Sequence, residues 1–204
     1  MAKQQYLSTV SMTTFADFVM KSGTPKATVV KRWKHKPDYS PSTDYYRGLR
    51  EAIVESHSTN SGFDPIDRAV ANSSQSRSSN YKAMAKSYKR WLGKKKPVWF
   101  QPNKRTWSAN KIAVNVRPEL GLDFSGTEHA IKLYFKADPI AKNRAVVLLQ
   151  LMAESFPSLL KRGGVVSILD VRQGKLFTAT ASNSLLSAQL QGEAAYWASV
   201  WPAV

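Results

Sequence analysis

The sequence contains no cysteine, which excludes disulfides, thiolate zinc sites and cysteine nucleophiles. Histidine is scarce as well: only His35, His57 and His129 occur, and no two of them have the spacing of metal ligands. A Ser-His-Asp triad would have to use one of these three, and no GxSxG motif accompanies any of them. The sequence therefore offers little to the common hydrolase and zinc-enzyme chemistries.

Long apolar runs are also missing. No uninterrupted run exceeds the length of residues 145–149, whereas a membrane-spanning helix needs roughly 20 apolar residues. The opening residues, MAKQQYLST, have no apolar segment of the kind found in signal peptides. These absences predict a cytoplasmic protein without membrane contact, and a hydrophobic content of 43% is enough to build a buried core.

Acidic residues are the third shortage, with 14 Asp+Glu against 30 Lys+Arg and a formal net charge of +16. Residues 1–104 carry 19 Lys+Arg and 7 Asp+Glu, a net charge of +12, while residues 105–204 carry 11 and 7, a net charge of +4. Such an excess attracts polyanions, although a basic protein can also owe its charge to solubility alone. The asymmetry predicts one part that faces a polyanion and a second, more neutral part.

Helical periodicity dominates the first part of the chain. Two short helices on either side of Gly23 resemble a helix-turn-helix unit, and Thr24-Pro25 favours the start of the second. That second helix carries the first group of candidate nucleic-acid-binding residues, Lys26, Lys31, Arg32 and Lys34. The pair of helices could read DNA or could be a basic hairpin packed on its neighbours. Further on, the serine-rich residues 72–80 predict a flexible linker.

A second basic stretch follows the linker, beginning with a helix over residues 81–92 and continuing into an aromatic strand over residues 98–100. Its candidate nucleic-acid-binding residues are Lys82, Lys86, Lys89, Arg90, Lys94, Lys95, Lys96, Trp99, Lys104, Arg105 and Trp107. Cations can meet phosphates and aromatic rings can stack on bases. The alternative is that the rings belong to the core and the lysines are merely solvated.

Residues 111–137 alternate between polar and apolar and predict two strands, 112–124 and 128–137, joined by a turn at Ser125-Gly126. One face is expected to bury Leu120, Leu122, Phe124, Ile131, Leu133 and Phe135. The opposite face then carries Glu119, Gly121, Asp123, Lys132, Tyr134 and Lys136, and any chemistry would sit there.

The remaining residues predict a helix over 138–156, a second hairpin about Gln173-Gly174 and a final Trp-rich helix that Asn183 caps. The predicted fold class is therefore α+β, with a helical, basic N-terminal part followed by a mixed β-sheet flanked by helices. We expect the division to fall at residue 80, giving regions 1–80 and 81–204 that can still pack as one unit.

From Tyr81 onward the predicted order of helix, three strands, helix and strand resembles the core of the PD-(D/E)xK nuclease family. That family uses one carboxylate at the end of a strand and a second acid two residues before a lysine on the next strand, so that both acids hold a divalent ion. Asp123 matches the first acid and Lys136 the lysine, whereas Tyr134 stands in place of the second acid. The resemblance implies a catalytic metal site only if Glu119 or Glu128 replaces the missing carboxylate.

Three interpretations of this face remain: a platform that binds nucleic acid without cutting, an active site completed by Glu119 or Glu128, and a solvated sheet face with Asp–Lys pairs. The predicted function is non-catalytic nucleic-acid binding with low sequence specificity and no cofactor. The alternatives are a nuclease that needs Mg²⁺ and a scaffold or regulatory protein that binds an acidic protein. The Trp-rich C-terminal helix could also contact a protein partner or a second copy of the chain.

Overall fold

A computed structural model describes residues 5–37 and 44–204. Its helices are α1 (Met12–Val19), α2 (Thr24–Lys34), α3 (Arg47–Ser58), α4 (Asp64–Ala71), α5 (Gln75–Leu92), α6 (Lys142–Ser155), α7 (Pro157–Lys161), α8 (Ser184–Val200) and the 3-10 turn η2 (Trp201–Ala203). Its strands are β1 (Ser8–Ser11), β2 (Val98–Phe100), β3 (Arg105–Ala109), β4 (Ile112–Val116), β5 (Leu120–Phe124), β6 (Thr127–Tyr134), β7 (Val165–Asp170) and β8 (Lys175–Ala179). The predicted α+β class is confirmed, because helices flank two mixed sheets. None of the described helices is both long and apolar enough to cross a membrane.

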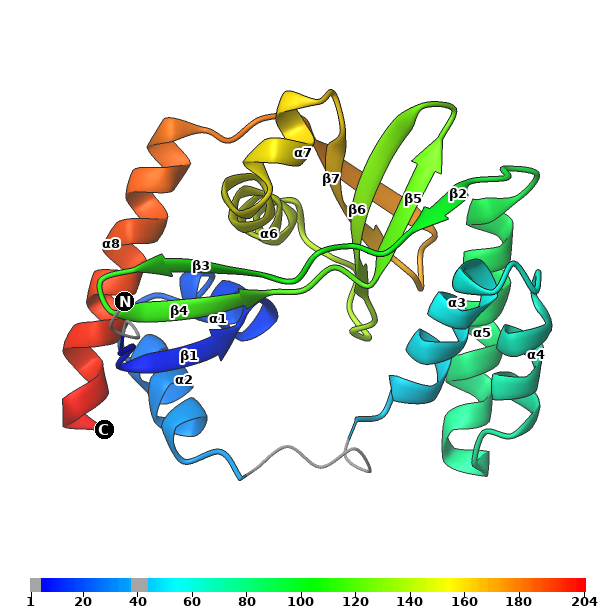
Figure 1. Cartoon of the computed structure of the whole chain (residues 1–204). Coiled ribbons are helices and arrows are strands. Elements are labelled where there is room, and N and C mark those ends of the chain that lie inside the picture. The colour runs from blue at the N-terminus through cyan, green and yellow to red at the C-terminus, as the bar shows by residue number, and fades with distance from the viewer. Residues whose placement is uncertain (1–4, 38–43) are drawn as a thin grey trace.

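The larger sheet has five strands in the order β2-β5-β6-β7-β8. Only β6 and β7 run parallel, and a parallel pair needs a crossover connection, which α6 supplies. Figure 1 shows α3, α4 and α5 on one side of this sheet and α6 on the other. Both faces of the central strands are therefore buried.

The hairpin of β5 and β6 has the predicted turn and the predicted apolar face, but the opposite face, expected to be open, is covered as well, with Gly121 and Tyr134 buried. Asp123 pairs with Glu128, and Ser125 and Gly126 turn the chain with positive φ angles of 57° and 88°. The face toward α3, α4 and α5 buries Leu120, Leu122, Ile131, Leu133 and Phe135, with Phe124 partly covered. The prediction of the core face is confirmed.

The first predicted strand, residues 112–124, is wrong in extent. It divides into β4 and β5, which belong to different sheets. The break falls at Pro118, which has no N–H to donate to a sheet ladder. Beside it, the Glu119 carboxylate accepts a hydrogen bond from the backbone N–H of Leu133 at 2.8 Å. The backbone of β4 has turned away from β6 at this point, so a side chain takes the place of a backbone acceptor.

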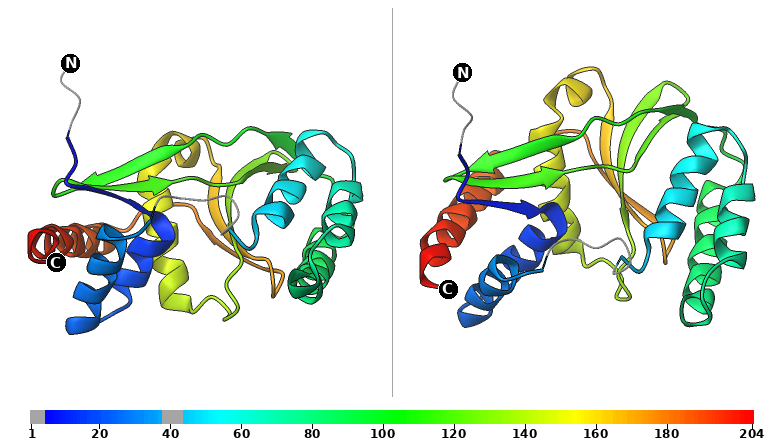
Figure 2. Two further views of the ribbon diagram at one scale, coloured as in Figure 1. Left: turned by 90° about the horizontal axis from the view of Figure 1, so that it is seen from below. Right: turned by 60° about the horizontal axis from the view of Figure 1, so that its bottom comes forward.

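The smaller sheet has three strands in the order β1-β4-β3, with β1 parallel to β4. It packs with α1, α6 and α8 around a second core, in which the ring of Phe15 lies 5.7 Å from that of Trp107 and 6.2 Å from that of Trp197. Figure 2 shows this sheet reaching away from the larger one toward α1, α2 and α8. The N-terminal residues thus complete a sheet formed by the later part of the chain.

The expected division at residue 80 falls inside α5, and the expected linker is helical from Gln75 onward. Tertiary contacts order this serine-rich segment. The Asn80 side-chain amide donates to the Tyr45 hydroxyl at 3.0 Å, and its carbonyl oxygen accepts from Arg172 at 2.9 Å. Because Arg172 follows β7, these bonds fasten the start of α5 to the sheet.

A half-buried histidine and a buried tyrosine join α3 to α5. The Nε2 atom of His57 lies 2.5 Å from the hydroxyl oxygen of Tyr88, which has no exposed surface. Burial lowers the pKa of His57 from 6.5 to about 4 and raises the pKa of Tyr88 above its ordinary value. Both groups are therefore neutral at pH 7.

We expect Leu133→Ala to lower the free energy of unfolding by about 2–5 kcal/mol, because it removes buried methyl groups and leaves a cavity. The matched surface change is Lys94→Ala, at an exposed position, which should alter stability by no more than about 0.5 kcal/mol. Urea denaturation of both variants measures the difference. Equal effects would contradict the assignment of Leu133 to the core.

We expect stability to fall in acid through His57. Since its pKa in the folded protein lies below the value of 6.5 in the unfolded chain, the unfolded chain takes up a proton first as the pH drops. The free energy of unfolding should therefore decrease from about pH 6.5 down to about pH 4. His57→Gln keeps a hydrogen-bonding side chain that does not titrate, so denaturation at pH 7 and pH 4.5 should show a smaller loss for this variant than for the native chain.

Candidate nucleic-acid interface

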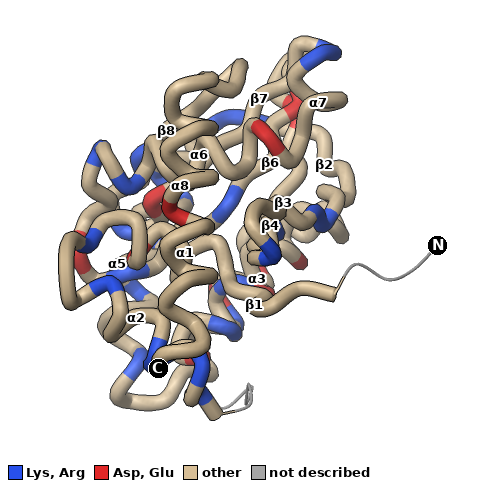
Figure 3. The backbone as a smooth tube through the Cα atoms, turned by 90° about the vertical axis from the view of Figure 1, so that its left-hand side faces the viewer, with Lys and Arg blue, Asp and Glu red and all other residues tan. Residues whose placement is uncertain are grey.

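The four candidate cations of α2 divide into two pairs. Lys26 forms an ion pair with Glu193 of α8, and Lys34 donates to the carbonyl oxygen of Trp201 at 2.9 Å. These two side chains fasten α2 to the C-terminal helix. Lys31 and Arg32 are exposed and have no hydrogen-bonding or acidic partner in the described part of the chain. Figure 3 shows the Lys and Arg positions along α2 on this side of the molecule.

The basic residues of α5 lie on a different side. Figure 1 places α2 and α5 at opposite ends of the molecule, with the larger sheet between them. Lys82, Lys86 and Lys89 line a shallow hollow against α4, where Lys89 pairs with Asp67 at 2.6 Å. Arg90, Lys94 and Lys96 are exposed, while Lys95 lies over the ring of Trp91. The two predicted groups of cations therefore do not form one continuous surface.

The aromatic candidates are structural. Trp107 is only 6% exposed and donates its indole N–H to Glu154 at 2.6 Å, so its prediction as a nucleic-acid-binding residue is wrong. Trp99 is half-buried and packs beside α3 and α5. The reason is the strand period, which turns both indoles toward a core. Lys104 lies between β2 and β3, and Arg105 begins β3; both are exposed.

The structure separates the residues of the nuclease-like face. Asp123 lies beside the turn, where its carboxylate accepts from the N–H of Gly126 at 2.6 Å. Its partner across the hairpin is Glu128, whereas Tyr134 ends β6 six residues further along, about 20 Å away at the rise of a strand. Lys136 lies beyond Tyr134. Asp123 and Lys136 are therefore at opposite ends of the hairpin and do not share a site.

Each other acid of that face is also engaged. Glu119 forms an ion pair with Lys132 and Glu128 pairs with Arg162. Tyr134 is buried, and desolvation together with Asp170 and Asp138 raises its pKa. Within the described ranges, no three His, Asp or Glu side chains are grouped so that they could hold a metal ion.

Lys136 instead belongs to a cleft of about 570 Å³ between α1, α2 and the start of α6. We call it the basic cleft. Its lining residues are Thr14, Asp17, Lys21, Val29, Arg32, Trp33, Lys36, Lys136 and Arg144. Five of these are cations and one is an acid, so the lining has a net charge of +4.

Asp17 organises the cleft. Its carboxylate accepts hydrogen bonds from Lys136 at 2.6 Å and from the guanidinium of Arg144. One acid on α1 thus holds a cation from the end of the hairpin and another from α6. Its single negative charge cannot balance both, and Lys21 and Arg32 at the rim have no acidic partner among the described residues.

Two of these cations are partly removed from water. Desolvation lowers the pKa of Lys136, against the opposing effect of Asp138, and desolvation also lowers the pKa of Arg144. Like charges at close quarters disfavour one another, and partial removal from water adds to that cost. An anion in the cleft would offset the repulsion between these cations, which makes the cluster a candidate site for binding phosphate.

Aromatic surface accompanies the cations. Trp33 is half-buried and donates its indole N–H to the carbonyl oxygen of Thr9 at 3.1 Å, which fixes the ring. The ammonium of Lys36 lies 4.7 Å from the centre of that ring. A fixed indole beside cations is a feature of surfaces that bind single strands.

Among the residues that meet here, only Arg32 and Lys136 were predicted from the sequence. Lys21, Lys36 and Arg144 were missed as site residues, as was Asp17. The basic character of α2 pointed to Lys36, but nothing local pairs Asp17 with Arg144, which is 127 residues away. No family model, curated protein or solved structure matches the chain.

Proposed function

We propose that this protein binds nucleic acid without cleaving it and with little sequence preference, and that the basic cleft holds the phosphates. The observation that carries the proposal is that five cations from separate segments line one cleft, whose single carboxylate, Asp17, pairs with two of them. Lys and Arg side chains contact phosphates rather than base edges in most complexes, which accounts for weak sequence preference. The fixed ring of Trp33 would offer a stacking surface to an unpaired base.

Non-cleavage rests on the separation of Asp123 from Lys136 and on the pairing of Glu119 with Lys132. A metal-dependent nuclease needs two carboxylates on one ion. The nearest substitute would have to come from Glu119, whose oxygens already accept from Lys132 and from the N–H of Leu133.

We expect Arg32→Gln with Lys36→Gln to weaken binding and to reduce its salt dependence. For each phosphate that the variant no longer neutralises, the slope of log affinity against log salt should fall by about 0.9 on duplex DNA, or about 0.7 on a single strand, because fewer counterions are released. Fluorescence anisotropy with short DNA and RNA, single-stranded and duplex, at several salt concentrations measures the slope.

The matched control for that experiment is Lys82→Gln with Lys86→Gln, which removes the same charge from exposed positions of α5. Its slope should equal that of the native chain. A change confined to the α5 variant would move the interface to α5, and an absence of binding to all four nucleic acids at low salt would contradict the proposed function itself.

We expect no cleavage of supercoiled or linear DNA in the presence of Mg²⁺ or Mn²⁺. Gel electrophoresis after long incubation checks this directly. Metal-dependent nicking that persists through purification and disappears in Glu119→Gln, but not in Glu51→Gln at an exposed position of α3, would establish the nuclease alternative in place of simple binding.

A further inference from the structure

A second concave site lies at the far end of α6 from the basic cleft. It is a pocket of about 460 Å³ between the β2–β3 connection, the start of β6 and α7. We call it the Arg105 pocket, after the residue that faces α7 across it. Arg144 near the start of α6 belongs to the basic cleft and Ser155 at its end belongs to this pocket, so about 17 Å of helix separates them. The volume falls within the roughly 300–1,000 Å³ typical of small-molecule sites.

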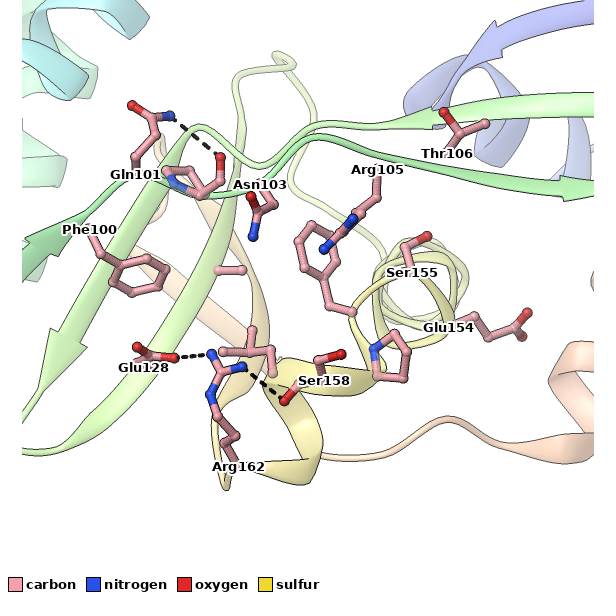
Figure 4. A pocket seen from close by; sticks show the side chains of 15 residues that line it. Phe100, Gln101, Asn103, Arg105, Thr106, Glu128, Glu154, Ser155, Ser158 and Arg162 are labelled. Atoms are coloured by element: carbon pink, nitrogen blue, oxygen red, sulfur yellow. Dashed lines mark hydrogen bonds and ion pairs between the residues drawn. The ribbon is translucent and has the colours of Figure 1, made fainter. Parts of the chain in front are cut away.

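The charges of this pocket leave one cation without a partner. Glu128 is taken by Arg162 at 2.8 Å, and Glu154 accepts from the indole of Trp107 at 2.6 Å. Figure 4 shows Glu154 directed away from the centre of the pocket, whereas Arg105 extends from β3 into it. The Arg105 guanidinium has neither an acid nor a hydrogen-bond acceptor in the described part of the chain. The pocket is therefore suited to one anionic group.

The other walls provide polar and apolar contacts for the rest of a ligand. Asn103 projects beside Arg105 from the same connection, and its amide can both donate and accept. Ser158 lies on the opposite wall, where its carbonyl oxygen accepts from Arg162 at 3.2 Å and leaves the hydroxyl available. Phe100 forms an apolar side wall. An aromatic wall, an amide and a guanidinium together match a flat heterocycle joined to a phosphate.

We propose that the Arg105 pocket binds a nucleoside monophosphate, either free or as the phosphorylated end of a strand. Arg105 meets the phosphate with its fork of N–H donors, which suits phosphate geometry better than a lysine would. The base lies against Phe100, and the amide of Asn103 meets its polar edge. This site is separate from the basic cleft and does not require it.

The sharpest test compares two neighbouring positions. Lys104→Gln removes the same charge one residue before Arg105, from a side chain that lines a different hollow beside α3. Calorimetric titration of the full chain with adenosine 5′-monophosphate should show binding that Arg105→Gln weakens at least about tenfold and that Lys104→Gln leaves unchanged, since hydrogen bonds to charged groups are worth that much. Adenosine without its phosphate should bind no better to the native chain than to Arg105→Gln.

Two further measurements distinguish a free nucleotide from a strand end, and the Arg105 pocket from the basic cleft. If only an oligonucleotide with a 5′-phosphate, and not one with a 5′-hydroxyl, loses affinity in Arg105→Gln, the ligand is a strand end. Arg32→Gln with Lys36→Gln should leave adenosine 5′-monophosphate binding intact; its loss there would assign the nucleotide to the basic cleft and overturn the proposal. The proposal would also be overturned if Arg105→Gln and Lys104→Gln weakened nucleotide binding equally. The same holds if Arg105→Gln changed the affinity for neither adenosine 5′-monophosphate nor the 5′-phosphorylated oligonucleotide.

Discussion

The parallel pairing of β6 with β7 is the constraint on which the rest of the molecule depends. Two adjacent parallel strands cannot be joined by a tight turn, so the chain must leave the sheet, form α6 and return. Because α6 covers one face, the other face needs its own cover, which α3, α4 and α5 provide. The chain thus has two cores, one on each side of the same strands, and Leu133 and Tyr134 of β6 enter different ones.

The same crossover positions both candidate sites. The segment that leaves β6 carries Lys136, and the first helical turn that follows carries Arg144. Asp17 pairs with both, and these ion pairs hold the start of α6 against α1. The same arrangement brings further cations close together. At its other end α6 delivers Ser155 to the pocket of Arg105. A structural requirement of the sheet therefore also determines where charge accumulates.

Local patterns in the sequence predicted the fold class and the central hairpin. The hairpin of β5 and β6 follows from its alternation and from the short turn at Ser125-Gly126, and the register follows from both. Pro118 was the local sign that the longer predicted strand breaks, and the same register already separates Asp123 from Lys136.

What could not be predicted depends on contacts between distant segments. No local pattern shows that α1 lies against α6, so Asp17 gave no sign of holding Arg144. The helical state of the serine-rich segment before Tyr81 likewise depends on Asn80 meeting Tyr45 and Arg172, which are distant in sequence. Periodicity identifies elements, whereas their assembly decides which charges share a site.

The pairing of β1 with β4 has a consequence for synthesis on the ribosome. Ser8 pairs with Ile112, so β1 is translated long before β4. During that time the backbone N–H and C=O groups of β1 have no partner strand. The entropy of closing so long a loop grows only slowly with length, but the delay is set by translation at about 5–20 residues per second. Until β4 has been translated, residues 8–11 have no partner strand, and unpaired strand edges can pair with another chain. The smaller sheet can therefore assemble only after β4 has been translated.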